Sequence, residues 1–141
     1  MTLLAPSSAA AVTDNWIGVA APKTVKPDKS FKLVAVATFD SRVHDPPYAY
    51  LKAGVWQHRG DDSCLKAVPV DRSGWKLLIH YDFYPEGDDS DDYPVEFTKS
   101  LKRKAGTYRW CGYVYTIEYD SSGNVSYHPK ARAQAKTIVE R

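Results

Sequence analysis

The stretch that decides the fold reads Ala105-Gly106-Thr107-Tyr108-Arg109-Trp110-Cys111-Gly112-Tyr113-Val114-Tyr115-Thr116. It begins with a turn and continues as a run of aromatic and β-branched residues, which is typical of a β-strand. It also holds one of the two cysteines of the chain. We interpret the other segments as strands that pair with this one or pack beneath it.

The composition is that of one globular domain with its own core. Of the 141 residues, 43% are hydrophobic and 26% are charged, a balance that disordered chains do not have. The 19 basic and 17 acidic residues leave a formal net charge of +2, far from the strongly basic balance of nucleic-acid-binding domains. No run approaches the roughly 20 apolar residues of a membrane span. We therefore predict a domain that neither spans a membrane nor binds nucleic acid.

The N-terminal residues resemble the end of a secretory signal peptide. Met1 to Ala11 are mostly small and apolar, and Ala9 to Ala11 form the small-residue pattern that precedes a cleavage site. We expect residues 1–12 to be a residual signal peptide or a disordered leader, and residues 13–141 to be the folded domain. The predicted location is secreted, extracellular or periplasmic.

The two cysteines, Cys64 and Cys111, are 47 positions apart, and neither has the CxxC spacing of a zinc site. In an exported chain they predict a single long-range disulfide, and by the loop-entropy model a closure of this length contributes about 4 kcal/mol. The alternative is two free thiols in a reducing compartment.

The first half of the chain contains three strong strand patterns. Residues 15–21 form a short strand that ends at Pro22. Residues 31–39 form a near-continuous β run that predicts a central strand, in which Phe31, Leu33, Ala35, Ala37 and Phe39 share one face. Residues 48–57 are extended as well. Residues 65–70 are expected to form a short edge strand interrupted by Pro69.

The second half continues in the same way. Residues 75–84 predict a strand whose core face carries Trp75, Leu77, Ile79, Tyr81 and Phe83. Another strand follows Pro94, and the turn at residues 120–124 indicates a hairpin. Residues 130–139 alternate like a strand, although a terminal helix is the alternative. Seven or eight short strands predict an all-β fold, a single antiparallel β-sandwich with one disulfide.

Two short motifs resemble immunoglobulin-like and fibronectin type III-like sandwiches. Ala105 to Tyr108 is similar to the entry to strand F, and Pro27 to Phe31 is similar to the turn before strand B. The resemblance covers roughly residues 15 to 139. It implies a tyrosine corner, in which the Tyr108 hydroxyl ties the strand to the preceding loop.

The cysteines depart from the antibody pattern. Cys111 lies three residues after Tyr108 instead of two, so by strand alternation it points away from the core, and Trp110 takes the core position. Cys64 lies after the third strand. A bridge would therefore tie the loop around Cys64 to the outer face of the strand. We expect the loop between His58 and Gly74 to cover part of that face, which is too apolar to be bare.

The aromatic surface that this loop leaves uncovered is the candidate binding patch. Rings with apolar bodies and polar tips suit both protein and carbohydrate ligands. The alternative is that the aromatic residues serve only the core. The candidate binding residues are Arg109, Tyr113, Tyr115, Tyr119 and Tyr127.

An acidic loop at residues 85–92 suggests calcium, which takes several oxygen ligands. Its candidate ligands are Asp88, Asp89, Asp91 and Asp92. Their spacing matches no EF-hand, and the alternative is a solvated loop. No other cofactor is predicted. Two basic clusters, at residues 23–32 and 99–104, are interpreted as solvated turns.

The sequence contains no nucleophile elbow, zinc-protease motif, phosphate loop or dinucleotide fingerprint. We therefore predict a secreted recognition domain without catalytic function, whose ligand is a protein or a carbohydrate, and no oligomeric state is predicted. One alternative is a carbohydrate-binding module. The other is a small secreted hydrolase that uses Asp82 and Glu86 as an acid pair.

Overall fold

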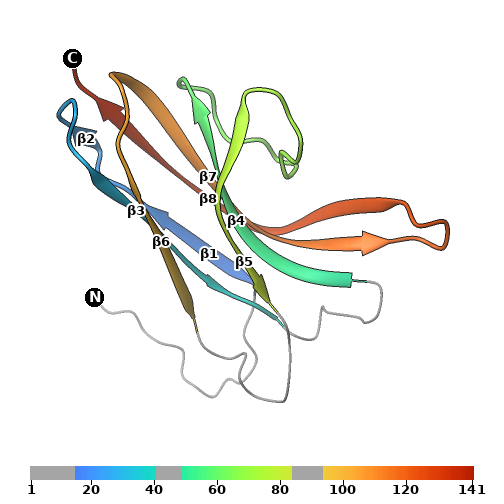
Figure 1. Cartoon of the computed structure of the whole chain (residues 1–141). Helices are drawn as coiled ribbons and strands as arrows, with labels where there is room; N and C mark the ends of the chain where they lie inside the picture. Colours follow the sequence, from blue (N-terminus) through green and yellow to red (C-terminus); the bar gives the residue numbers. More distant parts are fainter. Residues whose placement is uncertain (1–14, 41–48, 84–93) are drawn as a thin grey trace.

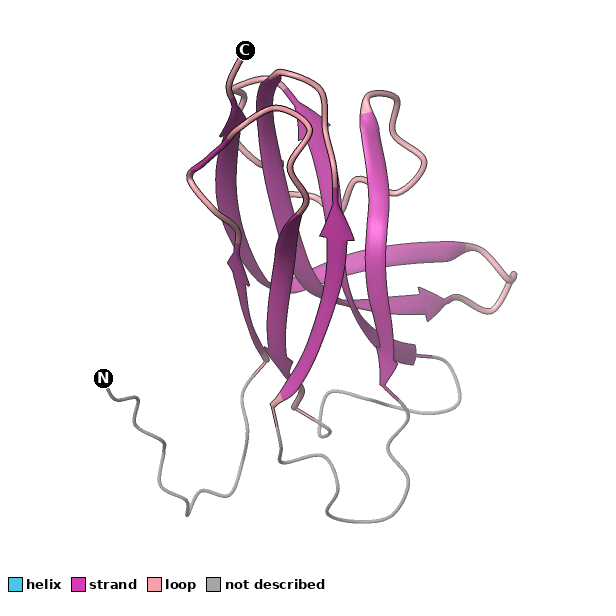
Figure 2. Cartoon of the chain, turned by 60° about the vertical axis from the view of Figure 1, so that its left-hand side comes forward, coloured by secondary structure: helices cyan, strands magenta, loops and turns pink. Residues whose placement is uncertain are grey.

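The computed structural model describes residues 15–40, 49–83 and 94–141. These residues form strands and loops and contain no helix (Figures 1 and 2). The eight strands are β1 (Trp16–Ala20), β2 (Thr24–Val25), β3 (Phe31–Thr38), β4 (Ala49–Arg59), β5 (Trp75–Phe83), β6 (Val95–Leu101), β7 (Gly106–Tyr119) and β8 (Val125–Val139). The all-β prediction is confirmed, and residues 1–14 of the predicted leader lie outside the described part of the chain.

The strands form two sheets. Sheet A has the order β1-β3-β6, and sheet B has the order β2-β8-β7-β4-β5. All described pairs are antiparallel except β2 with β8, which are parallel over two residues. Sheet B is curled into a half-barrel, and the β7–β8 hairpin projects from the rest of the molecule (Figure 1). No sequence pattern predicted the short parallel pairing of β2 with β8.

Strand β3 is the centre of sheet A, as the near-continuous β run of residues 31–39 predicted. Its core face carries Phe31, Leu33, Ala35 and Ala37, with Phe39 just beyond the strand, and all of these side chains are buried. The intervening side chains point to the outer face, because successive residues of a strand face opposite sides.

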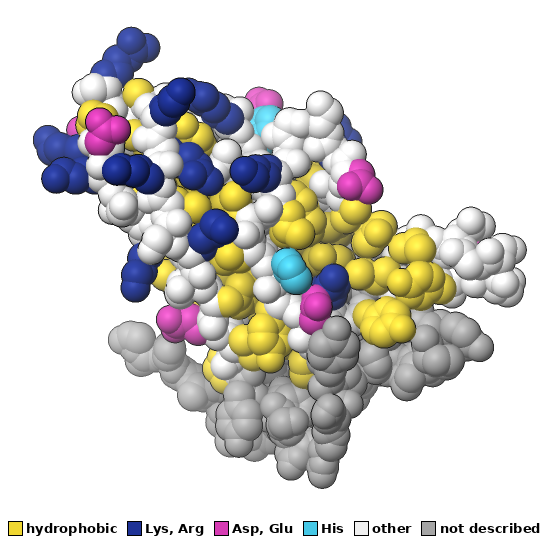
Figure 3. Space-filling model, in the orientation of Figure 1, with side chains coloured by type: hydrophobic (Ala, Val, Ile, Leu, Met, Phe, Trp, Pro, Cys, Tyr) yellow, Lys and Arg dark blue, Asp and Glu magenta, His cyan; other side chains and the backbone are white. Residues whose placement is uncertain are grey.

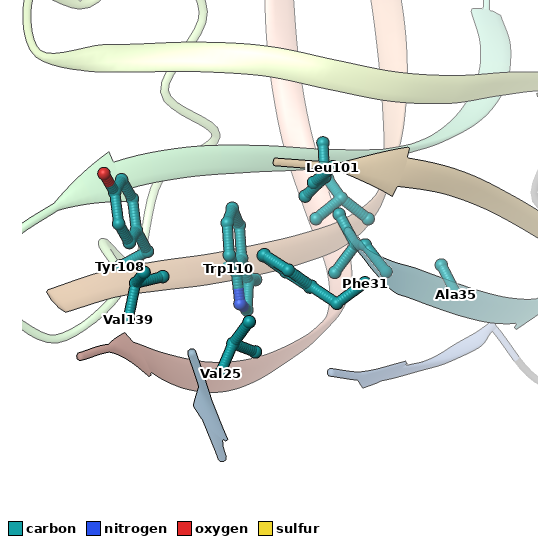
Figure 4. Packing of buried hydrophobic residues seen from close by; sticks show 9 residues of the cluster. Val25, Phe31, Ala35, Leu101, Tyr108, Trp110 and Val139 are labelled. Carbon is teal, nitrogen blue, oxygen red and sulfur yellow. The ribbon is translucent and has the colours of Figure 1, made fainter. Parts of the chain in front are cut away.

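A buried cluster joins the two sheets (Figure 4). Trp110 of β7 packs against Phe31 of β3, with the ring centroids 6.1 Å apart, and Val139 of β8 belongs to the same cluster. The indole Nε1 of Trp110 donates a 2.8 Å hydrogen bond to Thr137 Oγ1, whose hydroxyl donates in turn to the Pro22 carbonyl at 2.7 Å. The buried polar atoms therefore keep partners, which avoids the cost of an unsatisfied donor.

The tyrosine corner implied by the resemblance is present. The Tyr108 hydroxyl donates to the Lys104 carbonyl at 2.8 Å. Arg59 lies over the Tyr108 ring and donates to the Ala105 carbonyl at 2.8 Å. This arrangement fixes the turn that starts β7, and so fixes which side chains of β7 face the core.

Close packing between β1 and β7 depends on Gly112. A Cβ atom at this position would lie 2.6 Å from Val19 Cγ2 and 3.1 Å from Ile17 Cδ1. Those distances are shorter than nonbonded carbon atoms tolerate. Glycine therefore lets β1 approach the centre of sheet B.

Strand β5 departs from the predicted core face. Val55 pairs with Ile79 but Trp56 pairs with Leu77, so Leu78 is an extra residue that reverses the alternation. Trp75 and Leu77 therefore share the outer face of sheet B, and Leu77 is 40% exposed. On the core side, Phe83 is buried, Ile79 is partly buried and Tyr81 is 37% exposed.

One further sequence prediction is wrong. Residues 65–70 form no strand and instead belong to the loop that covers the outer face of sheet B. The strand predicted for residues 130–139 is confirmed, since this segment belongs to the long strand β8 and is not the alternative helix. The predicted hairpin is confirmed: in its turn, the Asp120 carboxylate accepts from the backbone N–H groups of Ser122 and Asn124 at 2.8 and 2.9 Å.

Candidate functional site

The candidate site is the outer face of sheet B, which is the face directed away from sheet A. The β4–β7 and β7–β8 registers bring Trp56 beside Cys111 and Tyr50 beside Ile117, with Tyr127 opposite Ile117 on β8. We divide this face into two parts. The covered half consists of Trp56, Cys111, Tyr113 and Tyr115, and the open half consists of Tyr50, Ile117, Tyr119 and Tyr127.

A disulfide pins the loop of residues 60–74 onto the covered half. Cys64 and Cys111 are bonded, with their Cα atoms 5.7 Å apart, so the predicted bridge to the outer face of β7 is confirmed. The Tyr113 hydroxyl donates to the Leu65 carbonyl at 2.8 Å. Val68 of the loop is buried against the covered half. The loop thus covers part of this face, as the sequence predicted.

The covered half is an aromatic cluster centred on Trp56. Its ring lies 5.7 Å from the Tyr113 ring at 78° and 5.8 Å from the Tyr115 ring at 58°, centroid to centroid. The first pair has the edge-to-face packing that aromatic rings prefer, and the second pair is tilted. Gly54 makes room for the indole, because a Cβ atom there would lie 2.9 Å from Trp56 Cζ3.

Polar contacts hold the start of the loop. Arg109 donates to the backbone carbonyls of Asp61 and Asp62 at 3.3 and 3.2 Å, and its guanidinium lies 3.6 Å from the Asp61 carboxylate. Lys136 forms a 3.1 Å ion pair with the same carboxylate. Arg109 was predicted as a binding residue, and the structure places it beneath the loop as an anchor.

Burial also changes the acidity of two candidate residues. It raises the pKa of Tyr113 from 10.0 to about 12, although the positive charge of Arg132 opposes the shift. Burial likewise raises the pKa of Tyr115 to about 12, and the negative charge of Asp82 adds to the effect. Both candidate tyrosines are buried beneath the loop, so a ligand does not reach them in this structure.

The open half extends beyond the reach of the loop. Tyr50, Tyr119 and Tyr127 are 42%, 40% and 39% exposed, and the rings of Tyr50 and Tyr119 meet edge to face with centroids 5.9 Å apart. Figure 3 shows hydrophobic side chains gathered on the side of the molecule that leads to the β7–β8 hairpin. Tyr119 and Tyr127 were predicted from the sequence, whereas Tyr50 was not and joins the group through the β4–β7 register.

A shallow pocket of about 130 Å³ lies between the open half and the end of β5. Its lining includes Tyr50, Ile117 and Tyr119 together with Lys52 and Asp82. Asp82 Oδ1 lies 3.1 Å from Lys52 Nζ and 3.4 Å from His80 Nδ1, though without the geometry of a good hydrogen bond. The pocket therefore combines aromatic walls with an ion pair.

The opposite face of the hairpin carries a serine, a histidine and an acid close together. Ser126 Oγ lies 2.9 Å from His128 Nε2, and Glu118 Oε1 lies 3.5 Å from the same nitrogen. A catalytic triad requires the acid on one ring nitrogen and the nucleophile on the other. This trio does not have that geometry.

The remaining chemical hypotheses involve residues outside the described ranges. The aspartates proposed as calcium ligands all lie there, and so does Glu86, the partner of Asp82 in the hydrolase hypothesis. Within residues 15–40, 49–83 and 94–141, His, Cys, Asp and Glu side chains do not gather in groups of three that suit a metal. This described part also contains no helix long and apolar enough to cross a bilayer.

No protein-family model matches the chain, and no curated protein matches it. Several solved structures are similar to the chain. The crystal structure of the CARDB domain of the PF1109 protein from Pyrococcus furiosus, in complex with di-metal ions, is similar with a TM-score of 0.52 and 13% identity, over 91% of this chain and 89% of that one.

The solution structure of the same domain gives a TM-score of 0.51 at 12% identity, over 90% and 94% of the two chains. A cohesin module from Clostridium perfringens gives 0.43 at 9% identity, over 91% and 98%. The CARDB likeness, at this level of identity, shows the fold alone. The class it defines is an all-β domain with an immunoglobulin-like fold.

Proposed function

We propose that the chain is an exported, non-catalytic recognition domain of immunoglobulin-like sandwich architecture, and that it binds a partner protein through the open half. The observation that carries this proposal is the uncovered group of Tyr50, Tyr119 and Tyr127, each about 40% exposed on adjacent strands. Tyrosine is enriched at protein interfaces, where its ring buries apolar area and its hydroxyl keeps a polar contact. The disulfide supports export, because disulfides persist in oxidising compartments.

The shape of the open half favours a protein ligand over a sugar. A sugar ring stacks on a flat aromatic surface, whereas the Tyr50 and Tyr119 rings stand at 89° to each other. Perpendicular rings beside a shallow pocket suit an inserted side chain of a protein, and apolar or aromatic anchors of this kind dominate interface energetics. The expected partner is therefore a protein that presents such an anchor.

Carbohydrate binding is the second candidate, and the pocket is the observation that favours it. Sugar hydroxyls need charged or polar partners beside an apolar wall, and the Lys52–Asp82 ion pair supplies them next to Tyr50. A carbohydrate-binding module would place its sugar there. The hydrolase hypothesis stays a prediction, tested by whether any activity that is found survives Asp82→Ala.

A matched pair of variants tests the proposal. Tyr119→Ser removes an exposed ring from the open half, whereas Tyr81→Ser removes a comparably exposed ring from the core side of β5. Binding is measured on an array of purified extracellular proteins, followed by calorimetry with each protein that binds, and by affinity electrophoresis in soluble polysaccharides. We expect protein binding that Tyr119→Ser weakens at least tenfold and that Tyr81→Ser leaves within about twofold.

The other outcomes are equally informative. Retardation by a polysaccharide that only Tyr119→Ser abolishes would replace the protein partner with a sugar. Equal binding by both variants would contradict the assignment of the open half. Absence of binding in both formats would contradict recognition itself.

A further inference from the structure

The two basic clusters of the sequence meet at one end of the fold. The registers pair Phe31 at the start of β3 with Leu101 at the end of β6, and Gly106 at the start of β7 with Val139 at the end of β8. The β2 residues 24 and 25 pair with the last two residues of β8. The segments around residues 23–32 and 99–104 therefore lie side by side, and the C-terminus is at the same end (Figure 1). We call this region the basic end.

The cations of the basic end far outnumber its acids. They are Lys23, Lys26, Lys29, Lys32, Arg59, Lys76, Lys99, Lys102, Arg103, Lys104 and Arg141. The acids on the same segments are Asp28 and Glu140, while Asp61 and Asp62 of the adjoining loop already contact Arg109, Lys136 and His58. Figure 3 shows Lys and Arg side chains crowded at this end. The net charge of +2 hides this asymmetry.

These cations have no carboxylate partners within the described residues. None of the ion pairs found there includes one of them. Arg59 and Arg103 donate instead to neighbouring protein oxygens, at Ala105 and Gln57. The lysines are exposed. Like charges concentrated in this way repel each other and destabilise the fold, and a bound polyanion relieves that repulsion.

The kind of polyanion follows from what surrounds the lysines. Of the aromatic residues of this end, Phe31, Tyr108 and Trp110 are buried, and Trp75 is partly buried with its ring stacked on His58, so they offer little surface on which a nucleic-acid base can stack. The large apolar residues of the basic segments, Val25, Phe31 and Leu101, are buried too. Ile138, which pairs with Thr24, is 40% exposed, but one such side chain is much smaller than the apolar face by which a segment enters a bilayer.

The arrangement of the lysines also favours a polyanion that is neither a nucleic acid nor a membrane. Some lie on the loop tips, and Lys32 lies on the outer face of β3 beside the edge strand β6. Lysines act as point charges that tolerate many anion geometries. Positive charges that continue from the tips onto a side face suit a chain of regularly spaced anions.

We propose that the basic end binds a linear anionic polysaccharide, carrying sulfate or carboxylate groups, at a site separate from the open half. The interaction is electrostatic, so it weakens steeply as salt rises. The basic end and the open half do not share residues. The proposal for the basic end is therefore tested independently of the protein partner proposed above.

Two variants with equal changes in net charge provide the test. Lys26→Glu with Lys29→Glu alters the basic end, and Lys66→Glu with Lys130→Glu alters exposed lysines on the pinned loop and the hairpin. Affinity is measured by surface plasmon resonance with heparin for sulfate, alginate for carboxylate, dextran as the neutral control, phosphatidylserine vesicles and a DNA duplex, at salt from about 50 to 200 mM.

We expect salt-sensitive binding to heparin, alginate or both, weakened at least tenfold by the change at the basic end and within about twofold by the control change. Whichever of the two polysaccharides binds more tightly identifies the anionic group. An equal loss of affinity in both variants would mean that binding depends only on net charge, and this would overturn the proposal. Tighter binding to vesicles or DNA, binding to dextran, or no binding at the lowest salt would overturn it as well.

Discussion

The covered and open halves of the outer face of sheet B both present tyrosines of β7 beside an aromatic residue of β4, yet they differ in exposure. Tyr113 and Tyr115 are buried, while Tyr119, four residues further along β7, is 40% exposed. The difference arises because the Cys64–Cys111 bond and the Tyr113 hydrogen bond hold a loop over one half only. On this face, burial is set by a tethered loop and not by side-chain type.

Removing the Cys64–Cys111 disulfide should have the largest effect on the difference between the covered and open halves. In the Cys64→Ser/Cys111→Ser variant we expect a loss of about 4 kcal/mol in the free energy of unfolding, because the unfolded chain regains the entropy of a long closed loop. The urea midpoint measures this loss. Nuclear magnetic resonance with a soluble paramagnetic probe measures loop opening, since the Trp56 ring, 3% exposed beneath the loop, then becomes accessible to the probe while the Trp110 ring stays buried. A loss below about 1 kcal/mol, with Trp56 still protected, would show that packing alone holds the loop.

We expect alkaline pH to destabilise the covered half. Burial raises the pKa of Tyr113 and Tyr115 from 10.0 to about 12, so the folded state favours the neutral phenols. The stability that this preference gives the folded state is fully present below pH 10. As the pH rises from 10 toward 12, the free energy of unfolding falls by about 2 kcal/mol for each tyrosine.

The Tyr115→Phe variant tests this origin. We expect a shallower fall in stability between pH 10 and 12, followed by denaturant unfolding at each pH. Tyr119→Phe is the matched control and should retain the slope of the unmodified protein. If Tyr115→Phe has the same slope as the control, ionisation of the covered tyrosine does not drive the loss.

The Tyr113 hydroxyl should make a smaller contribution to the free energy of unfolding. Tyr113→Phe deletes the donor to the Leu65 carbonyl, so we expect a destabilisation of about 1 kcal/mol. The same change at Tyr119 should stay within about 0.5 kcal/mol, because its side chain is exposed. Equilibrium unfolding in urea measures both variants. Equal values would mean that the loop hydrogen bond contributes no net stability.

Alternation predicted much of this arrangement from the sequence. It placed Trp110 in the core and Cys111 on the opposite face, and the position of the only other cysteine then indicated a loop over that face. Those inferences succeed because the side chains of a regular strand have a fixed period of two.

The same rule failed on β5, where the extra residue Leu78 moved Trp75 and Leu77 to the other face. A bulge of this kind depends on the partner strand, which local periodicity does not report. The two-residue strand β2 was missed because it exists only through its pairing with β8. Tyr50 was missed as a candidate because its place beside Ile117 and Tyr119 follows from the β4–β7 register, which local alternation does not supply.

The disulfide also determines what happens when the chain is cut. Lys66 and Arg72 are exposed in the loop between β4 and β5, which makes them accessible to trypsin. A single cut after either residue separates the chain into two polypeptides, yet Cys64 stays in one and Cys111 in the other. The nicked protein therefore migrates intact without reductant and as two fragments with it, and the strands of sheet B on both sides of the cut remain covalently joined.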